Sequence, residues 1–340
     1  MRAVQKTVSR LCIMAAYSGH TEVVKLLLDN NADVNQCGYT GATPLYVSVQ
    51  QGHTEVVKLL LDNNADVNAS RSDDGATPLY MAAQSRHIEE VKLLINRNAD
   101  VNKRRTNNGA TPLYAAAVKG HIEVVTLLLD NNADVNARRT DIGATPLYAA
   151  AVKGHIEVVK LLLNKNTNIN ACGYTGATPL FVAAQQGLTE VASLLLDKNA
   201  DLSESRTHDS ATPLSVAAQN THIEVVKLLI NHNADVNARR TDIDATPLFT
   251  AALNGHTDVV QLLLANNADA NVSCRDDGST PLYIAAQYGY TEVVKLLLEN
   301  NADVNRRRTF GGATPLYAAA QNGHTEVVNL LLNNKADVYP

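Results

Sequence analysis

Apolar positions along this chain recur with helical spacing inside units of nearly constant length. In residues 54–62 the valines and leucines form one broad helical face, wide enough to contact neighbours on both sides. A shorter segment, 44–51, precedes it, and Gly52 separates the two as a residue that readily takes a left-handed conformation. The pattern therefore predicts two antiparallel helices joined by a tight loop.

The start of the helix pair recurs along the whole chain. Thr43 can cap the first helix through its hydroxyl, and Pro44 suits the first helical position, where no amide donor is needed. The same tripeptide begins at Thr43, Thr77, Thr111, Thr145, Thr178, Thr212, Thr246, Thr280 and Thr314, which gives units of 33 or 34 residues. Such a period indicates a repeat array with one continuous core. We expect ten repeats over residues 10–340, the first one degenerate, after a short lead-in over residues 1–9.

The segments between helix pairs are polar. Residues 137–143 carry charges and turn residues, so each such connector is expected to project as a finger-like β-turn or hairpin. Asparagine, the best substitute for glycine in a left-handed cap, follows the second helix of nearly every repeat. These expected caps are Asn31, Asn64, Asn98, Asn132, Asn166, Asn199, Asn233, Asn267 and Asn301.

Composition and charge argue against several classes of function. The chain of 340 residues has no tryptophan, three phenylalanines and a formal net charge of −5. This charge does not favour a nucleic-acid partner, because binders of nucleic acid are usually strongly basic. No apolar window of about 18 residues predicts membrane insertion. The four cysteines lie in different repeats, which does not favour disulfides and points to an intracellular, cytoplasmic location.

Candidate catalytic and metal-binding residues recur too regularly to mark a site. Eight of the ten histidines occupy one equivalent loop position, so neighbours are expected about 8–10 Å apart, too far to share a zinc ion. The aspartate of Asn-Ala-Asp-Val-Asn also recurs along the array. No phosphate loop, Cys-x-x-Cys pair or nucleophile motif occurs. We therefore expect no enzyme activity, no metal and no cofactor.

Together these motifs resemble the ankyrin repeat, whose consensus contains Gly-x-Thr-Pro-Leu-His, Ala-Ala, Gly-His, Val-Val, Leu-Leu-Leu and Gly-Ala-Asp-Val-Asn. The resemblance extends from about Ser9 to Val338. It implies an all-α solenoid of helix-turn-helix repeats that acts as a scaffold in protein–protein recognition. An aromatic residue usually replaces the consensus histidine after Thr-Pro-Leu, and we expect this row to pack between repeats. Its members are Tyr46, Tyr80, Tyr114, Tyr148, Phe181, Phe249, Tyr283 and Tyr317, with Ser215 as the exception.

The resemblance also implies binding through the finger tips and the exposed ends of the first helices, on the concave side. The residues at these helix ends vary between repeats. They are Gln50-Gln51, Gln84-Ser85, Val118-Lys119, Val152-Lys153, Gln185-Gln186, Gln219-Asn220, Leu253-Asn254, Gln287-Tyr288 and Gln321-Asn322.

The fingers contain twelve of the sixteen arginines, a row suited to an acidic partner segment because guanidinium groups bind carboxylates in a planar fork. Nine acids share the fingers, so pairing between adjacent fingers is the alternative. The arginines are Arg71, Arg104, Arg105, Arg138, Arg139, Arg206, Arg239, Arg240, Arg275, Arg306, Arg307 and Arg308. The acids are Asp73, Asp74, Asp141, Glu204, Asp209, Asp242, Asp244, Asp276 and Asp277.

One stretch of the array combines the strongest basic charge with few acids. This central basic cluster consists of Lys103, Arg104, Arg105, Lys119, Arg138, Arg139 and Lys153. We predict that it supplies the charged contacts to a partner. Further candidate binding residues are Arg239, Arg240, Arg306 and Arg307, with Leu253 and Tyr288 as apolar contacts.

The last repeat has the sequence of an internal one, so an apolar surface is expected to be exposed there. Either a missing continuation of the chain or a second copy would cover it. The favoured function is non-enzymatic recognition of another protein. Three alternatives stay open: a regulatory or targeting array of a longer protein or of an effector secreted into a host cytosol, a homodimeric structural spacer, and a polyanion binder.

Overall fold

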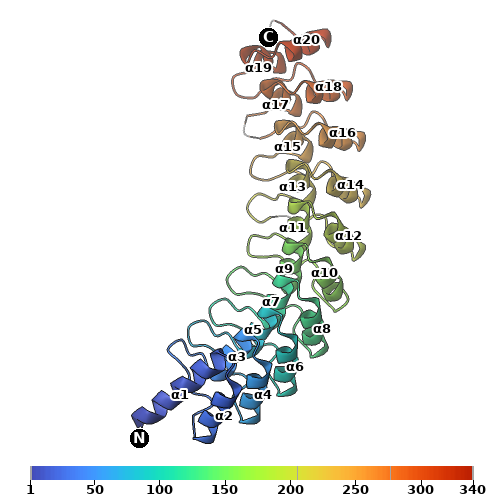
Figure 1. Ribbon diagram of the computed structural model, residues 1–340. Helices are drawn as coiled ribbons and strands as arrows, with labels where there is room; N and C mark the ends of the chain where they lie inside the picture. Colours follow the sequence, from blue (N-terminus) through green and yellow to red (C-terminus); the bar gives the residue numbers. More distant parts are fainter. Residues whose placement is uncertain (1, 205, 276, 339–340) are drawn as a thin grey trace. The chain divides into compact units, whose positions relative to one another are not determined.

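The computed structural model describes residues 2–204, 206–275 and 277–338, and it describes side chains from Arg10 onward. Asp276, one of the predicted finger acids, lies outside the described residues. The chain divides into two compact units, residues 1–173 (unit 1) and 174–340 (unit 2). Within each unit the first helices of the repeats form one row, the second helices form another, and the fingers project beside the first row (Figure 1).

Unit 1 consists of five helix pairs in its described part. The first helix spans sixteen residues and includes most of the predicted lead-in, whose separation from the array stays a prediction. The helices are α1 (Arg2–Tyr17), α2 (Thr21–Asp29), α3 (Pro44–Gln51), α4 (Thr54–Asp62), α5 (Pro78–Ser85), α6 (Ile88–Asn96), α7 (Pro112–Lys119), α8 (Ile122–Asp130), α9 (Pro146–Lys153) and α10 (Ile156–Leu163).

Unit 2 repeats the same arrangement in its described part. Its helices are α11 (Pro179–Gln186), α12 (Thr189–Asp197), α13 (Pro213–Gln219), α14 (Ile223–Asn231), α15 (Pro247–Leu253), α16 (Thr257–Ala265), α17 (Pro281–Tyr288), α18 (Thr291–Glu299), α19 (Pro315–Gln321) and α20 (Thr325–Asn333). The described residues contain no strand. The predicted all-α array of about ten two-helix repeats is confirmed.

The local rules read from the sequence account for the helix ends. The hydroxyl of Thr111 accepts a hydrogen bond from the amide of Tyr114 at 3.2 Å, and Pro112 takes the first helical position of α7. Gly120 ends α7 with a φ of 73°. The ring of His155 in the next repeat lies against this glycine, and its Nε2 is 3.0 Å from the carbonyl oxygen of Val118. The recurring histidines therefore link neighbouring repeats.

The left-handed asparagine caps are confirmed at eight of the nine expected positions, where φ lies between 59° and 66°. Asn166 is the exception, and the expectation for it was wrong. Helix α10 ends at Leu163, and its cap, Asn164, keeps a right-handed conformation. We attribute the difference to Thr167, which replaces the alanine found at this turn in other repeats. There the alanine amide closes the cap, as Ala133 does by donating to the carbonyl of Leu128 at 3.0 Å.

Replacing Thr167 by alanine is expected to stabilise unit 1. The hydroxyl of Thr167 is buried and has no hydrogen-bond partner. Removing an unpaired buried polar group recovers about 1 kcal/mol, and alanine would also let the cap close as in the other repeats. Urea denaturation followed by circular dichroism measures the change. An unchanged or lower midpoint for Thr167→Ala would contradict this account of the irregular turn.

Of the two conformations predicted for the fingers, β-turn and hairpin, the structure shows hydrogen-bonded turns. In one of them the amide of Arg105 donates to the carbonyl of Ala110 at 3.0 Å, and the amide of Gly109 donates back to Arg105 at 3.0 Å. A further backbone bond, from Thr140 to Asn108 at 2.9 Å, joins this finger to the next. Neighbouring fingers are thus held in register by the backbone, so the side chains they carry are presented at fixed positions.

Candidate functional site

The aromatic row and the finger arginines form one structural element. The guanidinium group of Arg105 lies 5.0 Å from the ring centroid of Tyr80, and that of Arg139 lies 5.3 Å from the ring of Tyr114. Arg71, Arg206 and Arg308 cover the rings of Tyr46, Phe181 and Tyr283 in the same way. Cations over aromatic faces are attracted by the ring quadrupole. These five members of the aromatic row therefore pack between repeats, as predicted, each with an arginine of the next finger above its ring.

These stacked arginines also pair with finger acids. Arg105 binds Asp74 of the preceding finger, whereas Arg139 binds Asp141 of its own finger, with Nε 2.9 Å from Oδ1. Burial alone would lower the pKa of Arg139, but hydrogen bonds to Asp141 and Tyr114 raise it on balance. Pairing occurs within fingers as well as between them, so the arginine row is partly neutralised.

In unit 2, the ion pair between Asp277 and Arg308 allows the contribution of such pairs to stability to be tested by changing the pH. Burial alone would raise the pKa of Asp277, but hydrogen bonds from Cys274 and Ser279 and the charge of Arg308 lower it to about 2. A folded pKa below the ordinary value of 3.8 gives stability that is present above about pH 4 and lost as the pH falls from 4 to 2. Because the side chain is 30% exposed, we expect only about 1 kcal/mol.

Replacing Asp277 by asparagine should therefore lower the free energy of unfolding of unit 2 at neutral pH by about 1 kcal/mol. The difference between the parent and this variant should become smaller at pH 2. Urea midpoints measured at pH 7, 4 and 2 give the comparison. The same difference at all three pH values would show that the carboxylate charge is irrelevant.

Arg104 and Arg138 behave differently from the stacked arginines. Arg104 donates to the backbone carbonyl of Arg138 at 2.8 Å, and Arg138 donates to the carbonyls of Gly143 and Cys172. Each therefore bridges to the following finger through its guanidinium group. Both side chains are exposed on the fingers. They stabilise the finger row and keep their charge, because a carbonyl does not neutralise a guanidinium group.

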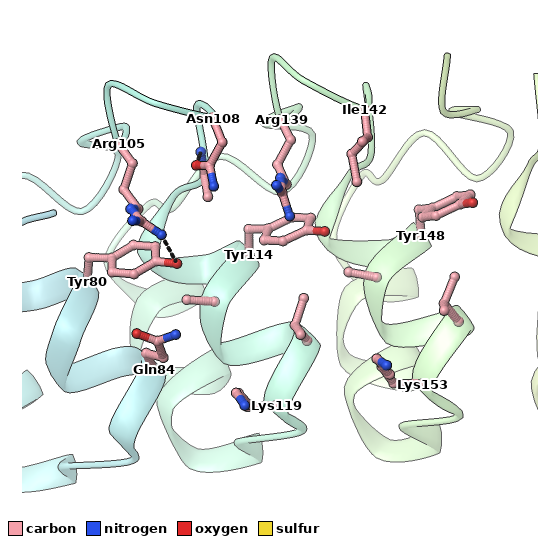
Figure 2. Close-up of a pocket in the computed structure, with 15 residues that line it drawn as sticks. Tyr80, Gln84, Arg105, Asn108, Tyr114, Lys119, Arg139, Ile142, Tyr148 and Lys153 are labelled. Atoms are coloured by element: carbon pink, nitrogen blue, oxygen red, sulfur yellow. Dashed lines mark hydrogen bonds between the residues drawn. The ribbon is translucent and has the colours of Figure 1, made fainter. Parts of the chain in front are cut away.

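A hollow of about 430 Å³ opens in unit 1 between the fingers and the ends of the first helices, and we call it the central hollow (Figure 2). Figure 2 shows Tyr80, Tyr114 and Tyr148 in a row along it, with finger residues on one side and Lys119 and Lys153 on the other. Val118, Val152 and Ile142 belong to its apolar lining. The guanidinium of Arg105 also donates to the hydroxyl of Tyr80 at 3.4 Å.

Four members of the central basic cluster meet at the central hollow: Arg105, Lys119, Arg139 and Lys153. Lys103, Arg104 and Arg138 do not line it. Lys119 and Lys153 are exposed and form no ion pair within the described part of the chain. Each stands in the last turn of its helix, where the helix dipole favours a positive charge. The hollow thus combines an apolar lining with two unpaired ammonium groups.

Tyr148 differs from the other aromatic residues around the hollow. The following finger has Cys172 and Gly173 where the fingers after Tyr80 and Tyr114 have arginines, and no guanidinium lies over the ring of Tyr148 among the described residues. Its phenol is half-buried, and burial raises its pKa. An aromatic surface is therefore left at one end of the hollow.

The candidates in unit 2 do not form a comparable site. Arg239 pairs with Asp244 at 3.3 Å, and Arg240 pairs with both Asp209 and Asp242. Leu253 is half-buried, whereas the Tyr288 ring is 50% exposed and stacks on Tyr290 with centroids 5.9 Å apart. Arg306 and Arg307 are exposed on their finger.

A search of the described residues finds no group of three or more histidine, cysteine or acidic side chains placed to hold a metal ion. None of the described helices has the length and apolar character needed to cross a membrane.

The hollow also contains residues that the sequence did not indicate as binding residues, namely Tyr80, Tyr114, Tyr148, Ile142 and Asn108. Gln84, Val118 and Val152, which line it as well, belong to the variable helix ends that the resemblance implied as a binding surface. One signal was present in the sequence. The aromatic residue and the arginine above it are always 25 residues apart, as in Tyr80 and Arg105 or Tyr114 and Arg139. This constant spacing indicates a contact between one repeat and the next finger.

Comparison with known families gives matches along nearly the whole chain. The family model described as ankyrin repeats (3 copies) matches residues 8–71, 68–139, 138–206, 203–276 and 268–340. A search of curated proteins gives no significant match.

Proposed function

Because the chain belongs to the ankyrin-repeat family, we propose that it recognises another protein through the central hollow of unit 1. Ankyrin repeats are generally protein–protein interaction modules and are typically non-enzymatic. We propose that this chain likewise acts by binding alone, on an intracellular partner that presents an acidic segment. The stiff repeat stack would hold the contact residues in place before binding, which lowers the ordering cost.

The observation that carries this proposal is the pairing of valine with lysine at two successive helix ends. Only the repeats of α7 and α9 have Val-Lys at the variable helix-end position. All four of these side chains line the central hollow, and neither lysine is used in an ion pair among the described residues. Exposed apolar surface beside unpaired positive charge suits a partner that has both apolar and acidic side chains.

The chain itself supplies a variant that should remove the site and keep the fold. Two other repeats have Gln-Gln at the same helix ends, at Gln50-Gln51 and Gln185-Gln186. Replacing Val118, Lys119, Val152 and Lys153 with glutamine therefore uses residues that this fold already accepts. We expect this variant, the quadruple-glutamine variant, to have the same urea midpoint as the parent within about 0.5 kcal/mol, as is usual for surface changes.

The test is an affinity pull-down from cytosolic extract with quantitative mass spectrometry. The matched control is Lys58→Gln with Lys92→Gln, which removes the same number of positive charges from the second helices α4 and α6 of unit 1. We expect a protein that the parent and the control retain and that the quadruple-glutamine variant loses by at least tenfold. Equal recovery by all three proteins would move the binding surface away from the central hollow.

Self-association is a second candidate, favoured by an exposed apolar hollow of about 340 Å³ at α19 and α20. Tyr317, Leu332 and Val338 line it and are 55%, 42% and 61% exposed. Light scattering over a range of concentrations tests this candidate, because a mass that stays monomeric throughout excludes it.

A further inference from the structure

We propose that the central hollow binds a segment in the polyproline II conformation whose acidic side chains are three residues apart. This inference rests on the proposed function and specifies the partner segment. It starts from the fact that the hollow contains the same set of groups twice. Tyr114, Val118 and Lys119 on α7 recur as Tyr148, Val152 and Lys153 on α9.

The distance between the two sets follows from helix packing. Helices α7 and α9 pack directly against each other, and the two sets occupy equivalent positions on them. Equivalent side chains on neighbouring packed helices are about 8–10 Å apart. A partner that contacts both sets in the same way must therefore repeat its own side chains at this interval.

An extended β-strand does not provide that repeat. Its side chains alternate between two faces, so those on one face recur about every 6.6 Å, and the next recurrence is at about 13 Å. A polyproline II helix has three residues per turn and a rise of about 3.1 Å, so one face recurs about every 9.3 Å. Its repeat therefore matches the step from Lys119 to Lys153.

The residues that line the central hollow determine which kind of side chain each face of a bound segment should have. The face toward the helix ends meets Lys119 and Lys153 and calls for carboxylates. Val118 and Val152, next to these lysines on the same helix ends, belong to the apolar lining and call for apolar side chains on an adjoining face. The polyproline II backbone has no internal hydrogen bonds, so its carbonyls need outside donors. Asn108 accepts from the amide of Ala110 through Oδ1, which leaves its Nδ2 free to donate.

The experiment measures fluorescence anisotropy of labelled peptides with the full chain. The probe peptide has four Glu-Leu-Pro repeats, which puts the carboxylates three residues apart. The first comparison peptide has the same composition with its glutamates at alternate positions, as a strand would require. The second has glutamine in place of glutamate. We expect the probe to bind at least tenfold more tightly than either one, and the quadruple-glutamine variant to lose this preference.

The outcomes separate the inference from the proposed function. Equal affinity for the probe and the alternate-position peptide, both weakened in the quadruple-glutamine variant, would overturn the three-residue spacing and leave protein recognition at the hollow intact. Absence of probe binding would also overturn it, while the pull-down tests the proposed function separately. If a single-stranded oligonucleotide displaced the labelled probe as effectively as the unlabelled probe peptide does, the hollow would be assigned to polyanions and the inference overturned.

Discussion

Replacing Val124 by glutamate is expected to lower the free energy of unfolding of unit 1 by about 3 kcal/mol or more. The Val124 side chain, in the first turn of α8, is fully buried. A carboxylate placed there has no hydrogen-bond donor nearby, because the preceding repeat presents Ile88 at the neighbouring position. Burial of an ionised group without a partner is among the costliest single changes in a core.

A rescue variant makes the reason testable. In the preceding pair of repeats, the buried carboxylate of Glu90 occupies the position equivalent to Val124, and it accepts a hydrogen bond from the hydroxyl of Thr54 at 2.5 Å. Adding Ile88→Thr to Val124→Glu recreates this pair one repeat later. We expect the second change to recover about 1 to 2 kcal/mol in urea denaturation. No recovery would mean that bulk or strain, and not the missing donor, causes the loss.

The converse change, Glu90→Val, is expected to stabilise unit 1 by about 2 kcal/mol. Glu90 is only 3% exposed, and it is a singular residue, because the other nine repeats have valine at this position. Valine has a similar volume and needs no partner in the core. The hydroxyl of Thr54 is only partly buried, so water can replace the lost carboxylate.

Urea denaturation at pH 7 measures the effect of Glu90→Val, and Thr54→Val is the matched control. The control removes the donor and keeps the carboxylate, so it should destabilise unit 1. If both variants destabilised it, the Thr54–Glu90 pair would be a net source of stability, and our account of the buried charge would be wrong.

The central hollow shows how far the sequence alone leads toward the site. Charge and repeat position singled out Lys119, Lys153, Arg105 and Arg139 without coordinates, and these four side chains meet at one hollow. The same reasoning grouped Arg104 and Arg138 with them, but these reach along the fingers to backbone carbonyls. Adjacent residues of a turn point in different directions, so the sequence does not show which of two neighbouring arginines faces the central hollow.

The sequence by itself determined the period, the two helices of each repeat, their threonine, proline and glycine signals, and most of the asparagine caps. These features depend on residues within one repeat and on a pattern that every repeat restates. Only the tertiary structure decided that arginines at one finger position cover five rings of the aromatic row, that Asn166 does not form its cap, and that two Val-Lys pairs line a common hollow. Those features depend on how one repeat is placed on the next, and contacts between side chains 25 to 35 residues apart form only once the repeats have stacked.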